Sequence, residues 1–269
     1  MPWVTKDGLD KRDLLFDAKG EYLYFTQQVT VSQLALVRMN MANGTIERLH
    51  PDAKDNEFGL ALSRDETHRV YMHNAGDLNL RVVITDLKDV QLGEVRFGGF
   101  SMLYSPTFTP DGQRVIYSHA DKERQQIVSV DLTGGDPKMH TDSGGINSFP
   151  TYSPDGKSIL FQSTRDGSFD IYTMDADGGN VRRLTDRAAI DYHPRWSPDG
   201  KSVVFTSNRD GNFELYQMDA DGTNERRLTH NPEADDYAAF HPDGKRIYYV
   251  TEHDSRHDIA VIDLTKLPK

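Results

Sequence analysis

The chain has 269 residues, of which 36% are hydrophobic and 27% charged, an ordinary composition for a globular protein. No stretch approaches the roughly 20 apolar residues that a membrane helix needs, and the lack of cysteine excludes disulfides, thiolate catalysis and cysteine–zinc sites. The net charge of −11 repels phosphate backbones, so nucleic acid is not expected as a partner.

One short motif recurs along the chain at a fixed spacing. Pro-Asp-Gly appears every 44 residues, beginning at Pro110, Pro154, Pro198 and Pro242. Two weaker copies precede it at steps of 46 residues, beginning at Ala18 and Arg64. Such self-similarity is typical of a repeat architecture with six units.

Each unit has the pattern of four short strands separated by turns. In the fourth unit we expect strands over residues 149–153, 158–163, 169–174 and 181–185. Pro presets the backbone of the first turn and Gly takes its positive φ. No segment has a sustained period of 3.6 residues, so almost no helix is expected. The pattern predicts an all-β fold.

A four-stranded unit of this length must stack on neighbours to bury its faces, which favours a six-bladed β-propeller over residues 1–269 as a single domain. Prolines inside the first strand, such as Pro150 and Pro194, fit an innermost edge strand. The sixth unit lacks a fourth strand. Thr5 lies 13 residues before the next turn, as do Thr141 and Thr185. We therefore expect residues 3–5 to complete the last blade and close the ring.

The repeat resembles a known family. The segment from Phe149 through Pro154-Asp155-Gly156 to Phe161, with Arg182-Arg183-Leu184-Thr185 after it, is similar to the WD40-like repeat of TolB-type propellers. The resemblance implies a propeller that binds a protein partner, and it favours the periplasm. From the sequence alone, we expect a periplasmic protein if a signal peptide was removed and a cytoplasmic protein if the chain is complete as written.

Candidate binding residues gather where the first strands begin. Large aromatic and charged side chains occur there in several units, and aromatics and arginine contribute most to interface hot spots. The candidates of this kind are Tyr104, Phe149, Tyr192, His193, Arg195, Asp236 and Tyr237. Repeated aromatics can equally pack between blades. We expect Phe149 and Tyr237 to suit a core position, and Tyr104 and His193 to be more exposed.

Histidines form a second group of candidates. His73 and His119 hold equivalent places in the second and third units and, with His193, could converge on one mouth of the channel. Propeller-type oligogalacturonate lyases hold a metal in such a channel. No close-spaced pair of ligands is present here, however, so neither a metal nor a cofactor is predicted.

Two functions follow from this pattern. The first is a non-enzymatic binding propeller that recognises a protein, a peptide or a small ligand at one mouth of the channel, without membrane insertion and as a monomer. The alternative is a carbohydrate-active lyase or hydrolase that uses channel histidines, with or without a divalent metal. No serine-hydrolase elbow, P-loop or His-Glu-x-x-His motif is present to support an enzyme.

Overall fold

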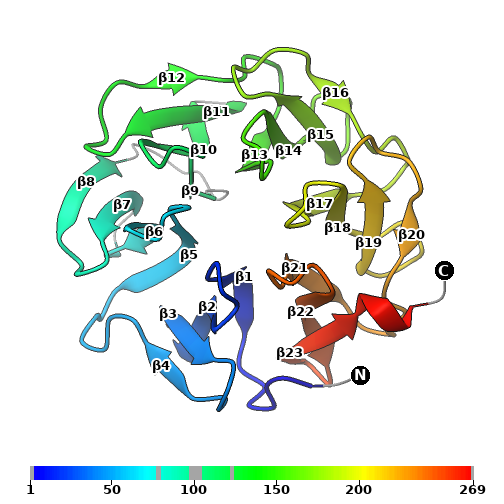
Figure 1. Ribbon diagram of the computed structural model, residues 1–269, viewed down its shortest axis with the longest axis horizontal. Helices are drawn as coiled ribbons and strands as arrows, with labels where there is room; N and C mark the ends of the chain where they lie inside the picture. The colour runs from blue at the N-terminus through cyan, green and yellow to red at the C-terminus, as the bar shows by residue number, and fades with distance from the viewer. Residues whose placement is uncertain (1–2, 77–79, 97–104, 122–123, 268–269) are drawn as a thin grey trace.

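The chain forms a ring of six small antiparallel sheets. The computed structural model describes residues 3–76, 80–96, 105–121 and 124–267 (Figure 1). In every sheet the strands are paired in chain order, and the first strand lies nearest the axis (Figure 1). The predicted six-bladed β-propeller is confirmed.

The blades are numbered 1 to 6 along the chain. Blades 1 and 2 contain β1 (Lys11–Phe16), β2 (Tyr22–Thr30), β3 (Gln33–Asn40) and β4 (Ile46–Arg48), then β5 (Asn56–Leu62), β6 (His68–Asn74), β7 (Leu80–Asp86) and β8 (Gln91–Arg96). Blades 3 and 4 contain β9 (Thr107–Phe108), β10 (Arg114–Asp121), β11 (Arg124–Asp131) and β12 (Lys138–Met139), then β13 (Asn147–Tyr152), β14 (Ser158–Ser163), β15 (Asp170–Asp175) and β16 (Arg182–Arg183). Blades 5 and 6 contain β17 (Asp191–Trp196), β18 (Ser202–Ser207), β19 (Glu214–Asp219) and β20 (Arg226–Arg227), then β21 (Asp235–Phe240), β22 (Arg246–His253) and β23 (Arg256–Asp263).

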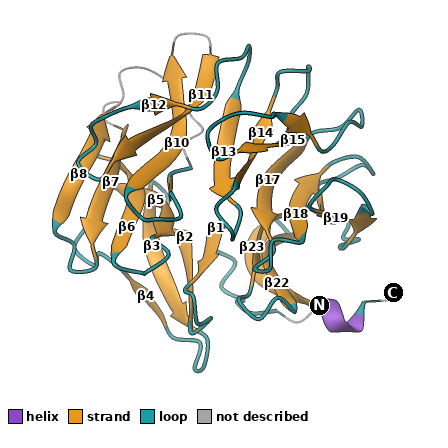
Figure 2. Cartoon of the chain, turned by 45° about the horizontal axis from the view of Figure 1, so that its top comes forward, coloured by secondary structure: helices purple, strands orange, loops and turns teal. Residues whose placement is uncertain are grey.

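Helix is almost absent, as expected. Within the described residues it amounts to one 3₁₀ turn, η1 (Leu264–Lys266), near the C terminus (Figure 2). No helix in that part of the chain is long and apolar enough to cross a membrane. The predicted second strand of blade 4 matches β14, whereas the predicted fourth strand, residues 181–185, is shortened to Arg182–Arg183.

The Pro-Asp-Gly motif forms the turn between the first and second strands of a blade. Ser153 Oγ donates to Asp155 Oδ1 at 2.6 Å and accepts from the backbone N–H of Ser158 at 3.0 Å. Gly156 closes the turn with a φ of +75°. In the weaker copy of blade 2, Glu66 takes the same left-handed conformation, with a φ of +55°. The degraded motifs are therefore turns of the same kind.

The first strand carries a β-bulge in five blades. The register of pairing with the second strand shifts in β1, β5, β13, β17 and β21. Pro150 and Pro194 lie in these bulges, where no N–H is needed for the ladder. A bulge redirects the side chains of its strand, and here it sets which residues face the axis.

The N-terminal segment closes the ring on β23, as predicted. Val4 N–H donates to the Ile259 carbonyl at 2.7 Å, and Trp3 forms a bridge with Ala260 (Figure 1). The Thr5 hydroxyl accepts from the Ile259 N–H at 2.9 Å. The equivalent threonines bond β11, β15 and β19 in the same way, at 2.9–3.0 Å. Residues 3–5 thus hold the fourth-strand position, although they form a bridge and not a full strand.

Apolar side chains from adjacent blades pack together between the sheets. At the seam of the ring, Phe16 and Leu23 of blade 1 join Tyr248 and Ile259 of blade 6 in one cluster. Clusters of the same kind lie between blades 5 and 6 and between blades 4 and 5. Each blade buries its faces only against its neighbours, which is the physical reason for the closed ring.

A histidine links blade 1 to blade 2 and makes that contact sensitive to pH. Hydrogen bonding to Glu57, with Nδ1 to Oε2 at 2.8 Å, raises the pKa of His50 against the effect of burial, and Asp89 adds to the rise. A raised pKa means that protonated His50 stabilises the fold fully below its ordinary pKa of about 6.5, and that this stability is lost at higher pH.

We therefore expect the free energy of unfolding to fall as pH rises from about 6.5 to 8, and His50→Gln to reduce that slope. Urea titrations at several pH values measure the free energy of unfolding and its slope against pH. His140→Gln is the matched control, since burial lowers the pKa of His140 and its contribution is complete above pH 6.5 or so. An unchanged slope in His50→Gln would contradict the role of this contact.

Candidate ligand site in the axial channel

Three aromatic rings form a layer across the channel near the end where the first strands begin, which we call the aromatic mouth. Phe149, His193 and Tyr237 occupy equivalent bulge positions in blades 4, 5 and 6. The ring centroids of Phe149 and His193 are 4.4 Å apart, and those of His193 and Tyr237 are 4.5 Å apart and stacked. The three blades thus join their rings into one continuous aromatic layer.

These side chains stand on strained backbone. The φ values are +54° at Phe149 and +51° at both His193 and Tyr237. In blade 2 the same position is Gly59, which adopts this conformation freely. Other residues lose about 1 kcal/mol or more there. Local backbone stability would favour glycine at these three positions, yet each carries an aromatic residue.

Polar contacts orient the central histidine of the layer. His193 Nδ1 lies 2.8 Å from Asp236 Oδ1, and its backbone N–H donates to Gln162 Oε1 of the preceding blade at 2.9 Å. Thr206 Oγ1 donates to Asp236 at 2.7 Å. Tyr192 stands beside the layer in an edge-to-face contact with His193, their ring centroids 4.4 Å apart, and burial raises the pKa of its hydroxyl.

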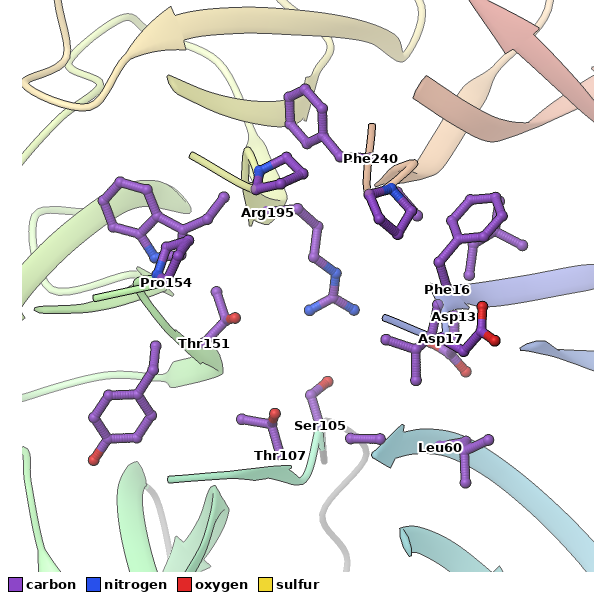
Figure 3. A pocket seen from close by; sticks show the side chains of 18 of the residues that line it. Asp13, Phe16, Asp17, Leu60, Ser105, Thr107, Thr151, Pro154, Arg195 and Phe240 are labelled. Atoms are coloured by element: carbon purple, nitrogen blue, oxygen red, sulfur yellow. The ribbon is translucent and has the colours of Figure 1, made fainter. Parts of the chain in front are cut away.

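A cavity of about 350 Å³ lies in the channel on the other side of this layer. Its walls run from the bulge residue Asp13 to the Pro-Asp-Gly turns, where Ala18 and Pro198 are exposed. The cavity therefore reaches the surface at the opposite end of the channel, which we call the turn mouth. Figure 3 shows the side chain of Arg195 extending toward its centre, with Asp13 and Asp17 on one side.

The guanidinium of Arg195 makes no hydrogen bond or ion pair with any residue that the structure describes. Burial lowers its pKa, and the more distant charges of Asp13 and Asp236 offset part of that effect. Both carboxylates already accept other hydrogen bonds, Asp13 from Thr26 and Asp236 from Thr206. A cation thus faces the cavity with its N–H groups unused.

The structure brings most of the predicted site residues together. Phe149, Tyr192, His193, Asp236 and Tyr237 form one contact network, and Arg195 lies directly beneath the aromatic layer beside a small gap. Phe149 is buried and His193 is half-buried, with 14% of its side chain accessible between the two flanking rings, so the expected order of these two holds; Tyr237, expected in the core, is also only half-buried. Tyr104 lies outside the described residues.

The expected convergence of the histidines is not observed. His73 lies at the end of β6, 3.3 Å from Asp55 Oδ2, and accepts from Arg81 Nε at 3.3 Å. His119 lies in β10 with its ring against Tyr117. Neither side chain lines the channel cavities, because both belong to second strands, one strand removed from the axis. In the described part of the chain no group of three or more potential metal ligands is found.

Sequence reasoning missed Asp13, Thr107 and Thr151, which line the cavity with Arg195. The repeat spacing contained a usable signal. Thr107 and Thr151 occupy the place of Arg195 in blades 3 and 4, and Asp13 occupies the place of His193 in blade 1. Their small or acidic side chains lacked the aromatic signature by which the candidates were chosen.

Fold and repeat together define a class of protein: a closed six-bladed β-propeller built from Pro-Asp-Gly-containing blades. The family model of the TolB beta propeller domain matches residues 97–267, which is more than half of the chain. The chain belongs to this TolB beta propeller family.

Solved structures agree on the fold. TolB from Acinetobacter baumannii superposes with a TM-score of 0.76 at 21% identity, over 92% of this chain and 62% of that one, so the chain spans less than two thirds of that protein. A putative TolB from Agrobacterium tumefaciens gives 0.70 at 22% identity, over 84% and 83%. Oligogalacturonate lyase from Vibrio parahaemolyticus gives 0.60 at 14% identity, over 97% and 92%. No curated protein matches the sequence.

Proposed function

We propose that this chain is a non-enzymatic binding propeller that recognises a polypeptide partner at the aromatic mouth. One observation carries the proposal: three successive blades place an aromatic ring on strained, left-handed backbone and stack the rings against one another. Strained residues cluster at ligand sites, where the surrounding structure holds them in place.

The composition of this mouth suits a protein interface. Tyr192 and Tyr237 are half-buried aromatics, and Asp236 adds a fixed carboxylate beside them. Tyrosine is enriched among the residues that contribute most to binding free energy, especially where its ring is already packed and little side-chain entropy remains to be lost. Family membership supports a binding role as well, since the structurally similar proteins include TolB proteins.

A lyase or hydrolase that uses channel histidines has less support. Of His73, His119 and His193, only His193 stands in the channel layer of the described structure. Its ring is stacked between two others and its Nδ1 faces Asp236, so it is held as part of a packed layer.

We expect Tyr192→Ala to weaken binding of a polypeptide partner by about 30-fold, as for a residue of a binding hot spot. Peptides selected from a random display library against the unmodified propeller serve as probes, and fluorescence anisotropy measures their Kd. Tyr22→Ala is the matched control. Tyr22 is also half-buried, but it lies at the start of β2 beneath Arg38, at the opposite end of the blade.

Equal loss of affinity in the two variants would assign binding to another surface. Failure to select any peptide that competes at the aromatic mouth would count against a polypeptide as the partner. Circular dichroism of Tyr192→Ala confirms that the blades remain folded.

A further inference from the structure

The cavity at the turn mouth holds the guanidinium of Arg195, to which no described residue bonds directly. In the layer of first-strand residues to which Arg195 belongs, the equivalent positions are Leu15, Ala61, Thr107, Thr151 and Ala239. Arg195 is the single ionised side chain of that layer. A guanidinium presents five N–H donors in a rigid fork, and at Arg195 no described residue accepts from them. A ligand with matching acceptors would occupy these donors.

Hydroxyl groups line the cavity beside Arg195. Ser105, Thr107 and Thr151 line it from blades 3 and 4, and Figure 3 shows the guanidinium of Arg195 directed toward the space between them. Hydroxyls can donate to an anion that a guanidinium holds from the other side. The wall therefore offers a forked cation and several neutral donors within one recess.

We infer that this cavity binds the carboxylate of a ligand, with Arg195 as the bidentate partner and the threonine hydroxyls as additional donors. The geometry of a guanidinium fork matches a planar carboxylate. A volume of about 350 Å³ admits a small organic acid or the end of a peptide. This site opens at the turn mouth, so it is separate from the proposed interface at the aromatic mouth.

The acidic residues of the cavity favour a singly charged group. Asp13 and Asp17 both line the cavity from blade 1, to one side of Arg195. Two carboxylates near one guanidinium repel a phosphate dianion more strongly than a carboxylate monoanion. The same residues would also favour a ligand that carries an amine or amide on the side away from its carboxylate.

Binding is tested with the purified chain and three probes: sodium 4-acetamidobutyrate, which carries one carboxylate and a distal amide, an N-acetylated Gly-Ser-Gly-Ala-Ala peptide with a free C-terminal carboxylate, and the same peptide amidated. Isothermal titration calorimetry in low-chloride buffer measures each affinity. We expect at least one carboxylate probe to bind, and Arg195→Met to weaken that binding by at least tenfold. Arg182→Met, which alters an exposed arginine outside the cavity, should bind as the unmodified chain does.

The probes separate two sources of the carboxylate. Binding of 4-acetamidobutyrate alone identifies a free acid as the ligand, whereas binding of the free peptide and not of its amide identifies a chain end. No binding of either carboxylate probe, or equal binding by Arg195→Met, overturns the inference.

A second readout does not depend on a ligand. Because no residue in the described part of the chain pairs with the guanidinium, Arg195→Met should leave the melting temperature unchanged or raise it. A lower melting temperature would show that Arg195 already stabilises the empty fold and would overturn the premise. The Tyr192→Ala variant should retain carboxylate binding, so the experiments can refute the carboxylate site and the interface at the aromatic mouth separately.

Discussion

Replacing Lys11 with methionine is expected to lower the free energy of unfolding by about 3 kcal/mol, which corresponds to a fall in Tm of roughly 6–9 °C. Lys11 is the first residue of β1 and only 1% exposed. Its Nζ is paired with Asp7, lies 3.6 Å from Asp258 Oδ1 on β23, and donates to the His257 carbonyl at 3.1 Å. The ammonium thus joins blade 1, the N-terminal segment and blade 6 at the seam.

The loss arises because the substitution leaves Asp258 buried without its cation. The Thr5 hydroxyl donates to the same carboxylate at 2.8 Å, so the threonine contact that closes the ring depends on it as well. Adding Asp258→Asn to Lys11→Met should recover part of the stability, since it removes the uncompensated charge.

Thermal unfolding followed by circular dichroism measures the effect. Lys157→Met is the matched control: Lys157 is an exposed lysine of a Pro-Asp-Gly turn, and its loss should change stability by no more than about 0.5 kcal/mol. Equal melting temperatures for the two variants would show that the seam does not depend on this ammonium.

Replacing Asp235 with asparagine is expected to stabilise the protein at pH 8 by about 3 kcal/mol. Burial raises the pKa of Asp235 from 3.8 to about 6, and hydrogen bonds from Thr251 and Asn231 offset only part of the rise. Burial thus disfavours the carboxylate in the fold. The penalty is absent below pH 3.8, grows as pH rises and is complete above about pH 6.

The repeat explains why this carboxylate lacks a counterion. In blade 5 the equivalent Asp191 lies 3.0 Å from Arg209 Nη2, and in blade 4 the amide of Asn147 accepts from Arg165 at 2.8 Å. Blade 6 has His253 in the arginine's place, and that side chain is exposed. Asn147 also shows that an amide fits this position of a blade.

Melting temperatures measured from pH 4 to pH 8 test the prediction. The gain from Asp235→Asn should reach about 6 °C at pH 8 and vanish near pH 4. Asp191→Asn is the opposite-sign control and should cost about 2 kcal/mol at pH 8, because it removes a charged acceptor from Arg209. A loss of stability in both variants would refute the penalty assigned to Asp235.

Much of the fold could be predicted from short-range chemistry. The Pro-Asp-Gly spacing located every turn between first and second strands, including the copy in which Glu66 replaces glycine. The phase of Thr5 relative to Thr141 and Thr185 predicted the closure, because each of these hydroxyls accepts from one backbone N–H of a third strand. The predicted strand ends were less accurate, since they depend on how far two neighbouring strands remain hydrogen-bonded.

The site was only partly predictable. Positions within the repeat correctly grouped Phe149, His193 and Tyr237, but they could not show that a bulge turns the three rings into one stacked layer. The same reasoning placed His73 and His119 at the mouth, whereas second strands hold them away from the axis. A one-residue bulge changes which face a side chain occupies, and no local pattern marked it.

By itself, the sequence determined the number of blades, the turns and the closure of the ring, because each depends on residues a few positions apart or on one constant spacing. Only the tertiary structure decided what the channel contains. Arg195 is an ordinary arginine in one strand. Among the described residues its charge lacks a direct partner because five other strands place Leu15, Ala61, Thr107, Thr151 and Ala239 in its layer. Whether a charge is neutralised depends on the side chains within a few ångströms of it, and in a ring those neighbours come from every blade.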